Sequence, residues 1–281
     1  MTGIDPHTHS CFSDGTDTPT QLMEKAARAG LSAVGLTDHD TVAGWEEASA
    51  AVPVTGVSLL RGMEVTCRGQ GVSVHLLSYL HDPSFAPLAR VCEATIESRL
   101  GRARQMVENL SADFPITWEQ VQSFAPADGP VGRPHIADAL VSAGCFPDRA
   151  ACFTHVLHPR GPYYVSTFAP EAVEAVELVR AAGGVAVLAH PRARARQKLL
   201  PVSVIADMVD AGLAGIECFH RDHGEEDVAQ ALQLADRFGL FVTGSSDYHG
   251  WGKPNQLGEN TTSVEALSCI EEAGKLEVIR A

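Results

Sequence analysis

The chain has 281 residues, of which 45% are hydrophobic and 20% are charged. This composition is that of a packed globular protein and argues against disorder. The formal net charge is -14, from 35 acidic and 21 basic residues, and it disfavours an extended nucleic-acid surface because such surfaces concentrate Lys and Arg. A small anionic substrate stays compatible with this charge, since bound divalent cations would offset part of it.

Cysteine usage and the first residues of the chain indicate a cellular compartment. Seven cysteines are scattered without a C-x-x-C pair, which favours reduced thiols over a disulfide framework or a zinc–thiolate site. The chain reaches Asp5 and His7 without a signal-sequence pattern, and no apolar run is long enough to cross a bilayer. We therefore predict a soluble, cytoplasmic protein without membrane contact.

The predicted elements alternate between helix and strand over most of the chain. The first predicted helix begins at the N-cap Thr18, carries Pro19 in its first turn and stops at Gly30. Predicted strands then cover 33–37, 57–65, 72–80, 185–188, 215–218 and 240–243, and further predicted helices cover 170–182, 199–211 and 225–238. Such alternation predicts βα units and a mostly parallel sheet.

The stretch from 85 to 162 interrupts this alternation. It is long, helical in pattern and rich in Arg. A helical insertion between two βα regions is typical of a cap or lid. We predict a β/α domain formed by residues 1–84 and 163–281 and an inserted helical cap subdomain formed by residues 85–162.

Histidines and carboxylates gather mostly where the predicted strands end. These candidate metal ligands are His7, His9, Asp14, His39, Glu64, His75, His190, Asp247 and His249, and His75 lies within its predicted strand. In a (β/α) barrel the carboxyl ends of the strands meet at one face, so separated segments can converge on one site. The distribution predicts a single polar centre.

The spacing within these segments favours metal binding. His7 and His9 lie two residues apart, and on an extended chain such residues face the same side and can reach one metal. The same spacing relates Asp247 and His249, while Glu64 can bridge two metals through its two oxygens. Imidazoles and carboxylates without thiolates suit Zn, Mn or Fe, and two such ions can clamp the attacking and leaving oxygens of a hydrolysed bond.

In order and over nearly the whole chain, these segments resemble the motifs of the PHP (polymerase and histidinol phosphatase) family. The matching segments are Asp5-Pro6-His7-Thr8-His9-Ser10 with Ser13-Asp14-Gly15, Thr37-Asp38-His39-Asp40, Glu64, His75, Ala189-His190-Pro191 and Ser246-Asp247-Tyr248-His249-Gly250. The resemblance implies an α/β fold, a distorted seven-stranded (β/α) barrel with an inserted cap, that binds up to three divalent metals and cleaves phosphoesters. It also implies three ligand sets, namely His7, His9, Glu64 and Asp247, then Glu64, His75 and His190, then Asp14, His39 and His249.

A segment of the insertion sharpens this resemblance. Residues 131–137 are similar to the G-R-P-H-I-A segment of a stand-alone PHP subgroup that includes nucleoside 3',5'-bisphosphate phosphatases and exonucleases acting at the 5' ends of short RNAs. The resemblance implies that Arg133 clamps a phosphate, a task that suits its planar guanidinium. A salt bridge is the alternative for Arg133, and His135 is either a substrate contact or a structural histidine.

Other residues near predicted strand ends are candidate substrate contacts. After His190 the family tends to carry a Gly-Arg-Tyr turn, whereas this chain has a basic run of Arg192, Arg194, Arg196 and Lys198. The run either binds phosphate or is solvated surface. We include Arg192, His220 and His223 as candidate substrate contacts, and we expect Asp38 to orient His39.

The sequence thus predicts a metal-dependent phosphoesterase that hydrolyses a phosphate monoester of a small nucleotide-like substrate by metal-bound hydroxide. Asp247, His39 and Arg133 are the predicted catalytic residues, and three divalent ions (Mn, Fe or Zn) are the predicted cofactors. The predicted partner is a small phosphorylated substrate or a short oligonucleotide, and the oligomeric state stays open. The alternatives are a 5'-3' exonuclease, a histidinol-phosphate phosphatase, an amidohydrolase or deaminase, and a non-catalytic metal-stabilised domain.

Overall fold

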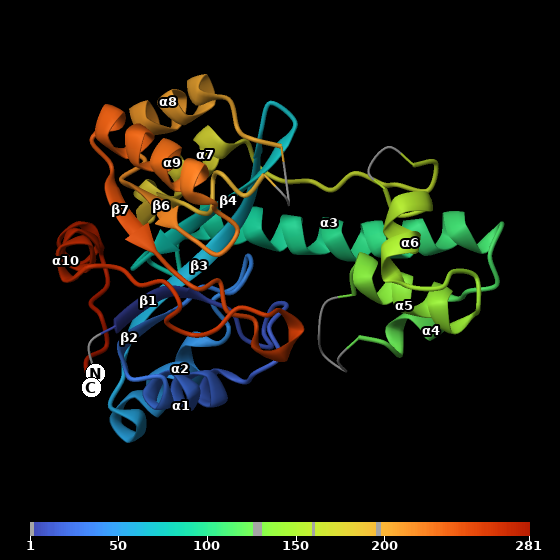
Figure 1. Cartoon of the computed structure of the whole chain (residues 1–281), viewed down its shortest axis with the longest axis horizontal. Helices are drawn as coiled ribbons and strands as arrows, with labels where there is room; N and C mark the ends of the chain where they lie inside the picture. Colours follow the sequence, from blue (N-terminus) through green and yellow to red (C-terminus); the bar gives the residue numbers. More distant parts are fainter. Residues whose placement is uncertain (1–2, 126–130, 159–160, 195–197) are drawn as a thin grey trace. The chain divides into compact units, whose positions relative to one another are not determined.

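The structure is a computed structural model that describes residues 3–125, 131–158, 161–194 and 198–281. Its strands, labelled in Figure 1, are β1 (Gly3–Thr8), β2 (Leu31–Leu36), β3 (Ser58–Gly69), β4 (Val72–Tyr79), β5 (Val185–Leu188), β6 (Gly215–Phe219) and β7 (Phe241–Gly244). Its helices are α1 (Pro19–Arg28), α2 (Trp45–Thr55), α3 (Ala86–Ser111), α4 (Trp118–Gln122), α5 (Arg133–Ser142), α6 (Arg149–His155), α7 (Ala172–Ala181), α8 (Val202–Ala211), α9 (Glu225–Phe238), α10 (Val264–Ala273) and the 3-10 helix η1 (Gly250–Gly252).

The seven strands form one sheet in the order in which they occur in the chain. The pairs β1–β2, β2–β3, β5–β6 and β6–β7 are parallel, whereas β4 runs antiparallel to both β3 and β5. Apart from this one strand, each new strand is reached through a helical crossover, as parallel pairing requires. The predicted α/β fold with a mostly parallel sheet is confirmed.

The β3–β4 hairpin changes the position predicted for Glu64. We expected Glu64 at the end of its strand, but β3 continues to Gly69, and Glu64 pairs with Leu77 within the ladder. The turn at Gln70 and Gly71 has φ angles of 49° and 76°, the left-handed pair that a two-residue hairpin loop uses. Strand β3 is longer than the parallel strands because its second half pairs with the antiparallel strand β4.

Helix α1 follows the local chemistry of its sequence. The Thr18 hydroxyl accepts a hydrogen bond from the Gln21 N–H, and the Gln21 side chain accepts one from the Thr18 N–H, which closes a capping box. Gly30 has a φ of +77°, a conformation that glycine adopts without strain. The predicted start and stop of this helix are confirmed.

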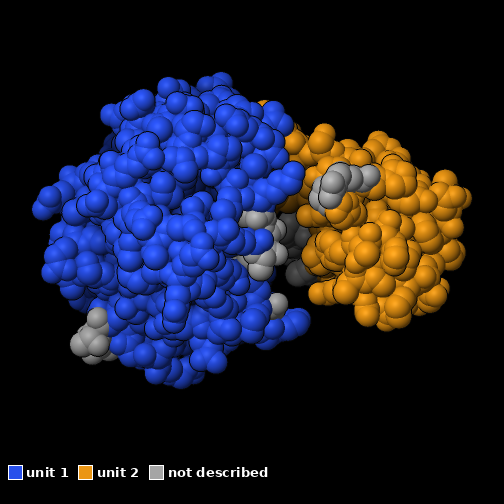
Figure 2. Space-filling model, turned by 45° about the horizontal axis from the view of Figure 1, so that its top comes forward, with its two compact units in different colours: residues 1–92, 169–281 blue, residues 93–168 orange. Residues whose placement is uncertain are grey.

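The chain divides into two compact units, coloured separately in Figure 2. Unit 1 comprises Met1–Cys92 and Ala169–Ala281, and it contains the whole sheet; unit 2 comprises Glu93–Phe168 and is helical. Unit 1 has its apolar core between the sheet and the flanking helices, with Leu36, Leu59, Leu76, Val176, Ile205 and Ile216 among the buried residues. Unit 2 has a core of its own, which includes Met106, Leu110, Val121, Ile136, Leu140 and Leu157.

The two outer strands of the sheet are linked through the segment that follows β7. Thr8 forms a parallel bridge with Tyr248, and the His9 N–H donates to the Tyr248 carbonyl over 2.8 Å. The Thr262 N–H donates to the Ile4 carbonyl, also over 2.8 Å. These contacts bring the end of β1 beside the residues that follow β7. Within the described residues, no helix combines the length and the apolar character needed to cross a bilayer.

Candidate metal centre

The nine predicted ligands come together in unit 1, at the edge of the sheet where the parallel strands end. They lie at or after the ends of β1, β2, β5 and β7, while Glu64 and His75 project from the β3–β4 hairpin. Three overlapping groups have ligand atoms close enough to share a metal ion: His7, His9, Glu64 and Asp247; His9, Asp14, His39 and His249; and His39, Glu64 and His75. The first group equals one of the expected sets, and the second adds His9 to another. The third contains His39 in the place where His190 was expected beside Glu64 and His75.

The carboxylate of Glu64 lies at the middle of these groups. Its Oε1 is 2.8 Å from His75 Nδ1 and 3.1 Å from His190 Nε2. Its Oε2 is 3.2 Å from both His9 Nε2 and His39 Nδ1. Because each oxygen faces a different set of imidazoles, the carboxylate has the arrangement of a bridge between two cation positions.

His9 belongs to both the first and the second groups, and Asp247 belongs to the first. Asp247 Oδ1 is 3.2 Å from His9 Nε2 and 3.5 Å from His7 Nε2. On the other side, Asp14 Oδ1 is 3.7 Å from His9 Nδ1 and 3.1 Å from His249 Nε2. The predicted H-x-H and D-x-H segments therefore meet face to face.

Several buried polar atoms of this cluster have no hydrogen-bond partner among the described residues. They are His9 Nδ1, His39 Nδ1, His190 Nδ1, His220 Nε2 and Glu64 Oε2. Leaving buried polar atoms unpaired costs free energy, so these atoms indicate that a further group binds in the cluster. The donor set, imidazole nitrogens and carboxylate oxygens without sulfur, fits divalent Mn, Fe or Zn.

Burial and mutual contact shift the pKa values of the carboxylates and imidazoles in the cluster. Burial would raise the pKa of Glu64, but His39, His75 and His7 outweigh burial and hold that pKa well below its usual range. Burial lowers the pKa of His190 to about 4. For His9, burial lowers the pKa, but the nearby carboxylates of Asp247 and Glu64 outweigh it and raise the pKa to about 9. Burial likewise holds the pKa of His39 low, whereas for His7 the carboxylates of Glu64 and Glu217 outweigh burial and hold the pKa high. An ionised carboxylate among several imidazoles is a donor set that a divalent cation can bind, displacing any imidazole protons.

Glu217 is a buried member of the site that the sequence reasoning missed. Its Oε1 is 3.2 Å from His7 Nδ1, its Oε2 accepts the His190 N–H over 2.8 Å, and it also accepts from the Ser245 hydroxyl. A carboxylate on the far nitrogen of a histidine fixes the ring so that Nε2 faces the metal position. The available signal was an acidic residue within the apolar strand β6, since a buried charge needs a partner.

Two predicted ligands sit on strained backbone. His190 has a φ of 26° and Asp247 a φ of 51°, which places both in the left-handed region that non-glycine residues rarely occupy. The Asn255 amide donates to the carbonyls of Ser246 and Asp247 and stabilises the second of these turns. Strain of this kind persists where the surroundings determine the conformation, and it is common at functional sites.

Asp38 does not have the expected function of orienting His39. Its carboxylate accepts hydrogen bonds from the N–H and hydroxyl of Ser10 and from the hydroxyl of Ser13. It therefore fixes the loop that carries Asp14. The neighbouring Asp40 accepts from the N–H and hydroxyl of Thr66 and anchors the His39 turn to β3.

The candidate substrate contacts in unit 1 have other partners. His223 uses both ring nitrogens on backbone groups, Nδ1 with the Cys218 carbonyl at 2.9 Å and Nε2 with the Arg192 N–H at 3.2 Å. Arg192 and Arg194 donate to Gln230, and Arg194 also pairs with Asp227. Arg192 and Arg194 of the basic run are thus tied to α9, Lys198 is exposed, and Arg196 lies outside the described residues. His220, by contrast, has its Nε2 3.5 Å from Asp247 Oδ2.

Arg133 and His135 lie at the start of α5 in unit 2. The His135 Nδ1 accepts the Gly132 N–H over 3.1 Å, so this ring caps the helix. Arg133 donates to the Leu157 carbonyl over 3.4 Å, and its guanidinium lies 5.6 Å from the Phe153 ring centre and 5.9 Å from that of Tyr164. Both residues have local structural contacts.

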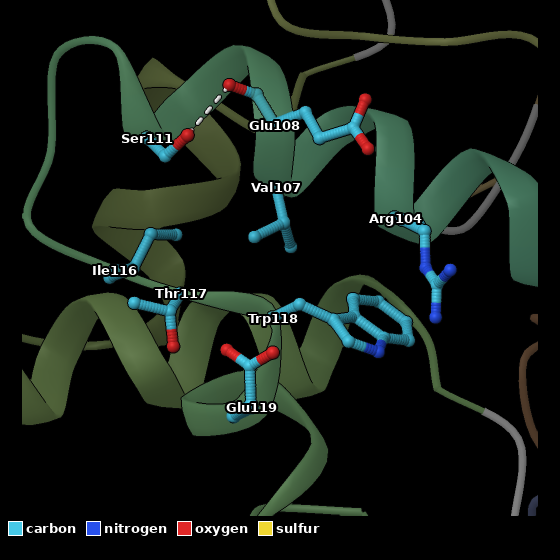
Figure 3. A pocket seen from close by; sticks show the side chains of 8 residues that line it. All are labelled: Arg104, Val107, Glu108, Ser111, Ile116, Thr117, Trp118 and Glu119. Atoms are coloured by element: carbon cyan, nitrogen blue, oxygen red, sulfur yellow. Dashed lines mark hydrogen bonds between the residues drawn. The ribbon is translucent and has the colours of Figure 1, made fainter.

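Unit 2 also contains an open pocket of about 430 Å³ between α3 and α4. Figure 3 shows Val107, Ile116 and Trp118 facing it, with the Arg104 guanidinium 5.0 Å from the Trp118 ring centre. At its edge the Ser111 hydroxyl donates to the Glu108 carbonyl over 2.8 Å. Histidine is absent from its lining, so the pocket differs in chemistry from the metal centre.

Comparisons with known proteins agree with this chemistry. A 3',5'-nucleoside bisphosphate phosphatase of Chromobacterium violaceum is 35% identical over 96% of this chain and 94% of its own length. A phosphoribosyl 1,2-cyclic phosphate 1,2-diphosphodiesterase of Eggerthella lenta is 34% identical over 88% of this chain and 94% of its own length. A 5'-3' exoribonuclease of Haemophilus influenzae is 28% identical over 95% of this chain and 97% of its own length.

Solved structures agree on the fold as well. A candidate metal-dependent phosphoesterase of Bifidobacterium adolescentis superposes with a TM-score of 0.89 at 42% identity, over 97% of this chain and 96% of the other. A Chromobacterium violaceum structure described as an amidohydrolase, with bound sulfate and no metal, has a TM-score of 0.83 at 32% identity over 99% and 98% of the two chains. The PHP domain profile matches residues 5–110. The chain therefore belongs to the PHP family and is a metal-dependent phosphoesterase.

Proposed function

We propose that the centre holds three divalent ions of Mn, Fe or Zn. The first position is formed by His7, His9, Glu64 and Asp247, the second by Glu64, His75 and His190 with His39, and the third by Asp14, His39 and His249 with His9. The observation that carries this proposal is the position of Glu64, whose two oxygens face different imidazoles. When bound, such ions act as Lewis acids and activate water at neutral pH.

The residues of the chain then have separate functions in the hydrolysis. Glu217 accepts the Nδ1 proton of His7 and keeps the Nε2 lone pair toward the centre. Asp247 and His39 are ligands on two sides of the centre, and they would hold the ions that activate the attacking water. Arg133 of unit 2 donates to equatorial oxygens of the phosphoryl group, whose charge grows in the transition state. No side chain has to form a covalent intermediate.

The proposed architecture follows the family pattern. The sheet closes as a distorted barrel through the segment after β7, which the Thr8–Tyr248 bridge supports. Residues 85–162 form a helical cap, and the separate core of unit 2 supports an inserted domain. His135 orients the start of α5 beside Arg133, while Arg192 and His223 shape the loop next to the centre.

The proposed substrate is a nucleoside 3',5'-bisphosphate, which loses one phosphate as a monoester. The 35% identity to a phosphatase of that specificity over nearly the whole of both chains supports it. A cyclic phosphodiester is the second candidate, because the 34% identical diphosphodiesterase is almost as similar. A short 5'-phosphorylated RNA is the third.

The test is a substrate panel with the Mn-loaded protein. It contains adenosine 3',5'-bisphosphate, a ribosyl 1,2-cyclic phosphate, 5'-phosphorylated RNA, histidinol phosphate and an amide set. The highest kcat/KM is expected on the bisphosphate, with Arg133→Ala lowering it roughly 10- to 100-fold, as expected for a lost charge-assisted hydrogen bond.

Arg149→Ala is the matched control for Arg133→Ala. Arg149 is an exposed arginine of unit 2 that pairs with Asp138, so its loss is expected to leave kcat/KM unchanged. Preferred mononucleotide release from RNA would reassign the substrate, and turnover of the amide set alone would refute the phosphomonoesterase proposal.

A further inference from the structure

Lys253 brings an ammonium group to the metal centre. It follows η1, four residues after His249, and its Nζ lies 2.9 Å from His249 Nε2 and 3.5 Å from Asp247 Oδ2. Its side chain is 30% exposed, so the ammonium group has access both to the centre and to solvent. The sequence reasoning did not include Lys253 among the site residues.

The hydrogen bonds of His249 determine which of its nitrogens carries the lone pair. His249 Nδ1 lies 2.8 Å from the Asp247 backbone carbonyl, which can only accept a hydrogen bond. Nδ1 is therefore the protonated nitrogen of the neutral ring, and Nε2, which lies between the Lys253 ammonium group and the Asp14 carboxylate at 3.1 Å, carries the lone pair. Lys253 donates to this lone pair.

The same lone pair is the one that a metal ion needs. A nitrogen lone pair cannot accept a hydrogen bond from an ammonium group and coordinate a cation at the same time. Lys253 and a metal ion at the third position therefore exclude each other at His249 Nε2. Once the cation is bound, the ammonium group loses its contact with His249 and is repelled by the new charge.

We propose that Lys253 is a further substrate-binding residue, whose ammonium group exchanges His249 for a phosphoryl oxygen when a metal ion occupies the third position. The inference rests on the proposed function of the centre. The anion that such a centre binds is a phosphoryl group, and a partly exposed ammonium group at its edge is a suitable donor to that group. Lys253 thus stabilises the empty centre with its charge and the loaded centre by binding substrate.

This exchange predicts two effects of opposite sign in Lys253→Met. Removing the competing ammonium group is expected to tighten the weakest Mn site roughly 2- to 5-fold, the range expected of a partly exposed ionic contact. Removing a charge-assisted donor is expected to weaken inorganic phosphate binding to the Mn-loaded protein roughly tenfold or more. Calorimetric titration of Mn into the metal-free protein and of phosphate into the loaded protein measures both.

Two further variants control the experiment. Lys253→Arg retains a cation and is expected to restore most of the phosphate affinity. Lys275→Met removes a lysine that pairs with Asp82 elsewhere in unit 1, and both dissociation constants are expected to stay at their wild-type values. A thermal melt of each variant verifies that it is folded.

The outcomes separate this inference from the proposed function. If wild-type protein binds Mn and phosphate while Lys253→Met weakens Mn binding or leaves phosphate binding unchanged, the inference is overturned and the proposed function stands. If wild-type protein binds Mn and no phosphate, the proposed function itself fails. Tighter Mn binding together with weaker phosphate binding supports the exchange.

Discussion

The two units of this protein differ in where their polar side chains lie and in what these side chains contact. Unit 1 buries a cluster of imidazoles and carboxylates, and several of their atoms have no hydrogen-bond partner among the described residues. In unit 2 many polar side chains act locally: Thr117 and Asp148 cap helices, and the Arg104 guanidinium lies over the Trp118 ring. From this difference we expect unit 1 to gain stability from bound cations in addition to its apolar core, whereas unit 2 depends on its apolar core.

The largest expected effect comes from Glu64→Gln in unit 1. The substitution removes the charge that faces both sets of imidazoles, so activity is expected to fall more than about 100-fold, beyond the range of indirect ligand effects. Phosphate release and metal content by mass spectrometry measure this. Glu171→Gln, at an exposed glutamate that pairs with Arg68, is the control. Full metal content with full activity in Glu64→Gln would contradict the central position of this carboxylate.

A pair of core substitutions tests whether the units are stabilised separately. Leu76→Ala in unit 1 and Leu140→Ala in unit 2 each remove a fully buried side chain, and each is expected to cost about 2–5 kcal/mol of unfolding free energy. Calorimetric scans with Mn and with chelator are the measurement. Chelation is expected to lower the unit 1 transition and not the unit 2 transition; a single transition that responds to metal in both variants would refute separate stabilisation.

A smaller effect is expected from Glu217→Gln. The variant keeps the shape of the side chain but weakens its hold on His7 Nδ1, so the ring loses its fixed orientation. Metal affinity is expected to fall about 10- to 100-fold, as for other partners of metal-bound histidines. Mn titration measures the change, with Glu119→Gln in unit 2 as the control. An affinity equal to wild type would show that Glu217 does not orient His7.

The smallest expected effect concerns pH and lies away from the centre. Burial lowers the pKa of His81 to about 4, and its Nδ1 is 2.8 Å from the Ser78 hydroxyl; Asp82 is the charged neighbour that opposes the shift. The unfolded chain takes up a proton near pH 6.5 and the folded chain only near 4, so stability falls as pH decreases between these values.

His81→Gln tests this contribution. From pH 7.5 to 5.5 the wild type is expected to lose about 1 kcal/mol more unfolding free energy than the variant. Chemical denaturation at the two pH values measures the difference. Equal losses in the two proteins would show that His81 does not contribute to the pH dependence.

Much of the centre could be predicted from the sequence because its signals are local. The spacing of His7 and His9 places both on one side of an extended chain, and strand-end positions converge in a parallel sheet. The reversal of β4 was beyond such reasoning, because an apolar run does not reveal the direction of its strand. Glu64 was consequently expected at a strand end rather than within a ladder.

The residues that support the ligands could not be found in this way. Glu217 contacts His7 from 210 positions away, and a single acidic residue within an apolar strand does not identify its partner. Lys253 follows the last motif in a segment without periodicity. The preference of Asp38 for Ser10 and Ser13 over the adjacent His39 depends on how the loop folds back.

The β3–β4 hairpin has a consequence for how the protein folds. It is the sheet pairing with the shortest chain connection, since Gly69 pairs with Val72 across a two-residue turn. Because closing a short loop costs little chain entropy, we expect this ladder to form before the parallel pairings that wait for helical crossovers. Its register already sets Glu64 and His75 on the same face, so a nascent chain would present part of a cation site before the rest of the sheet has assembled.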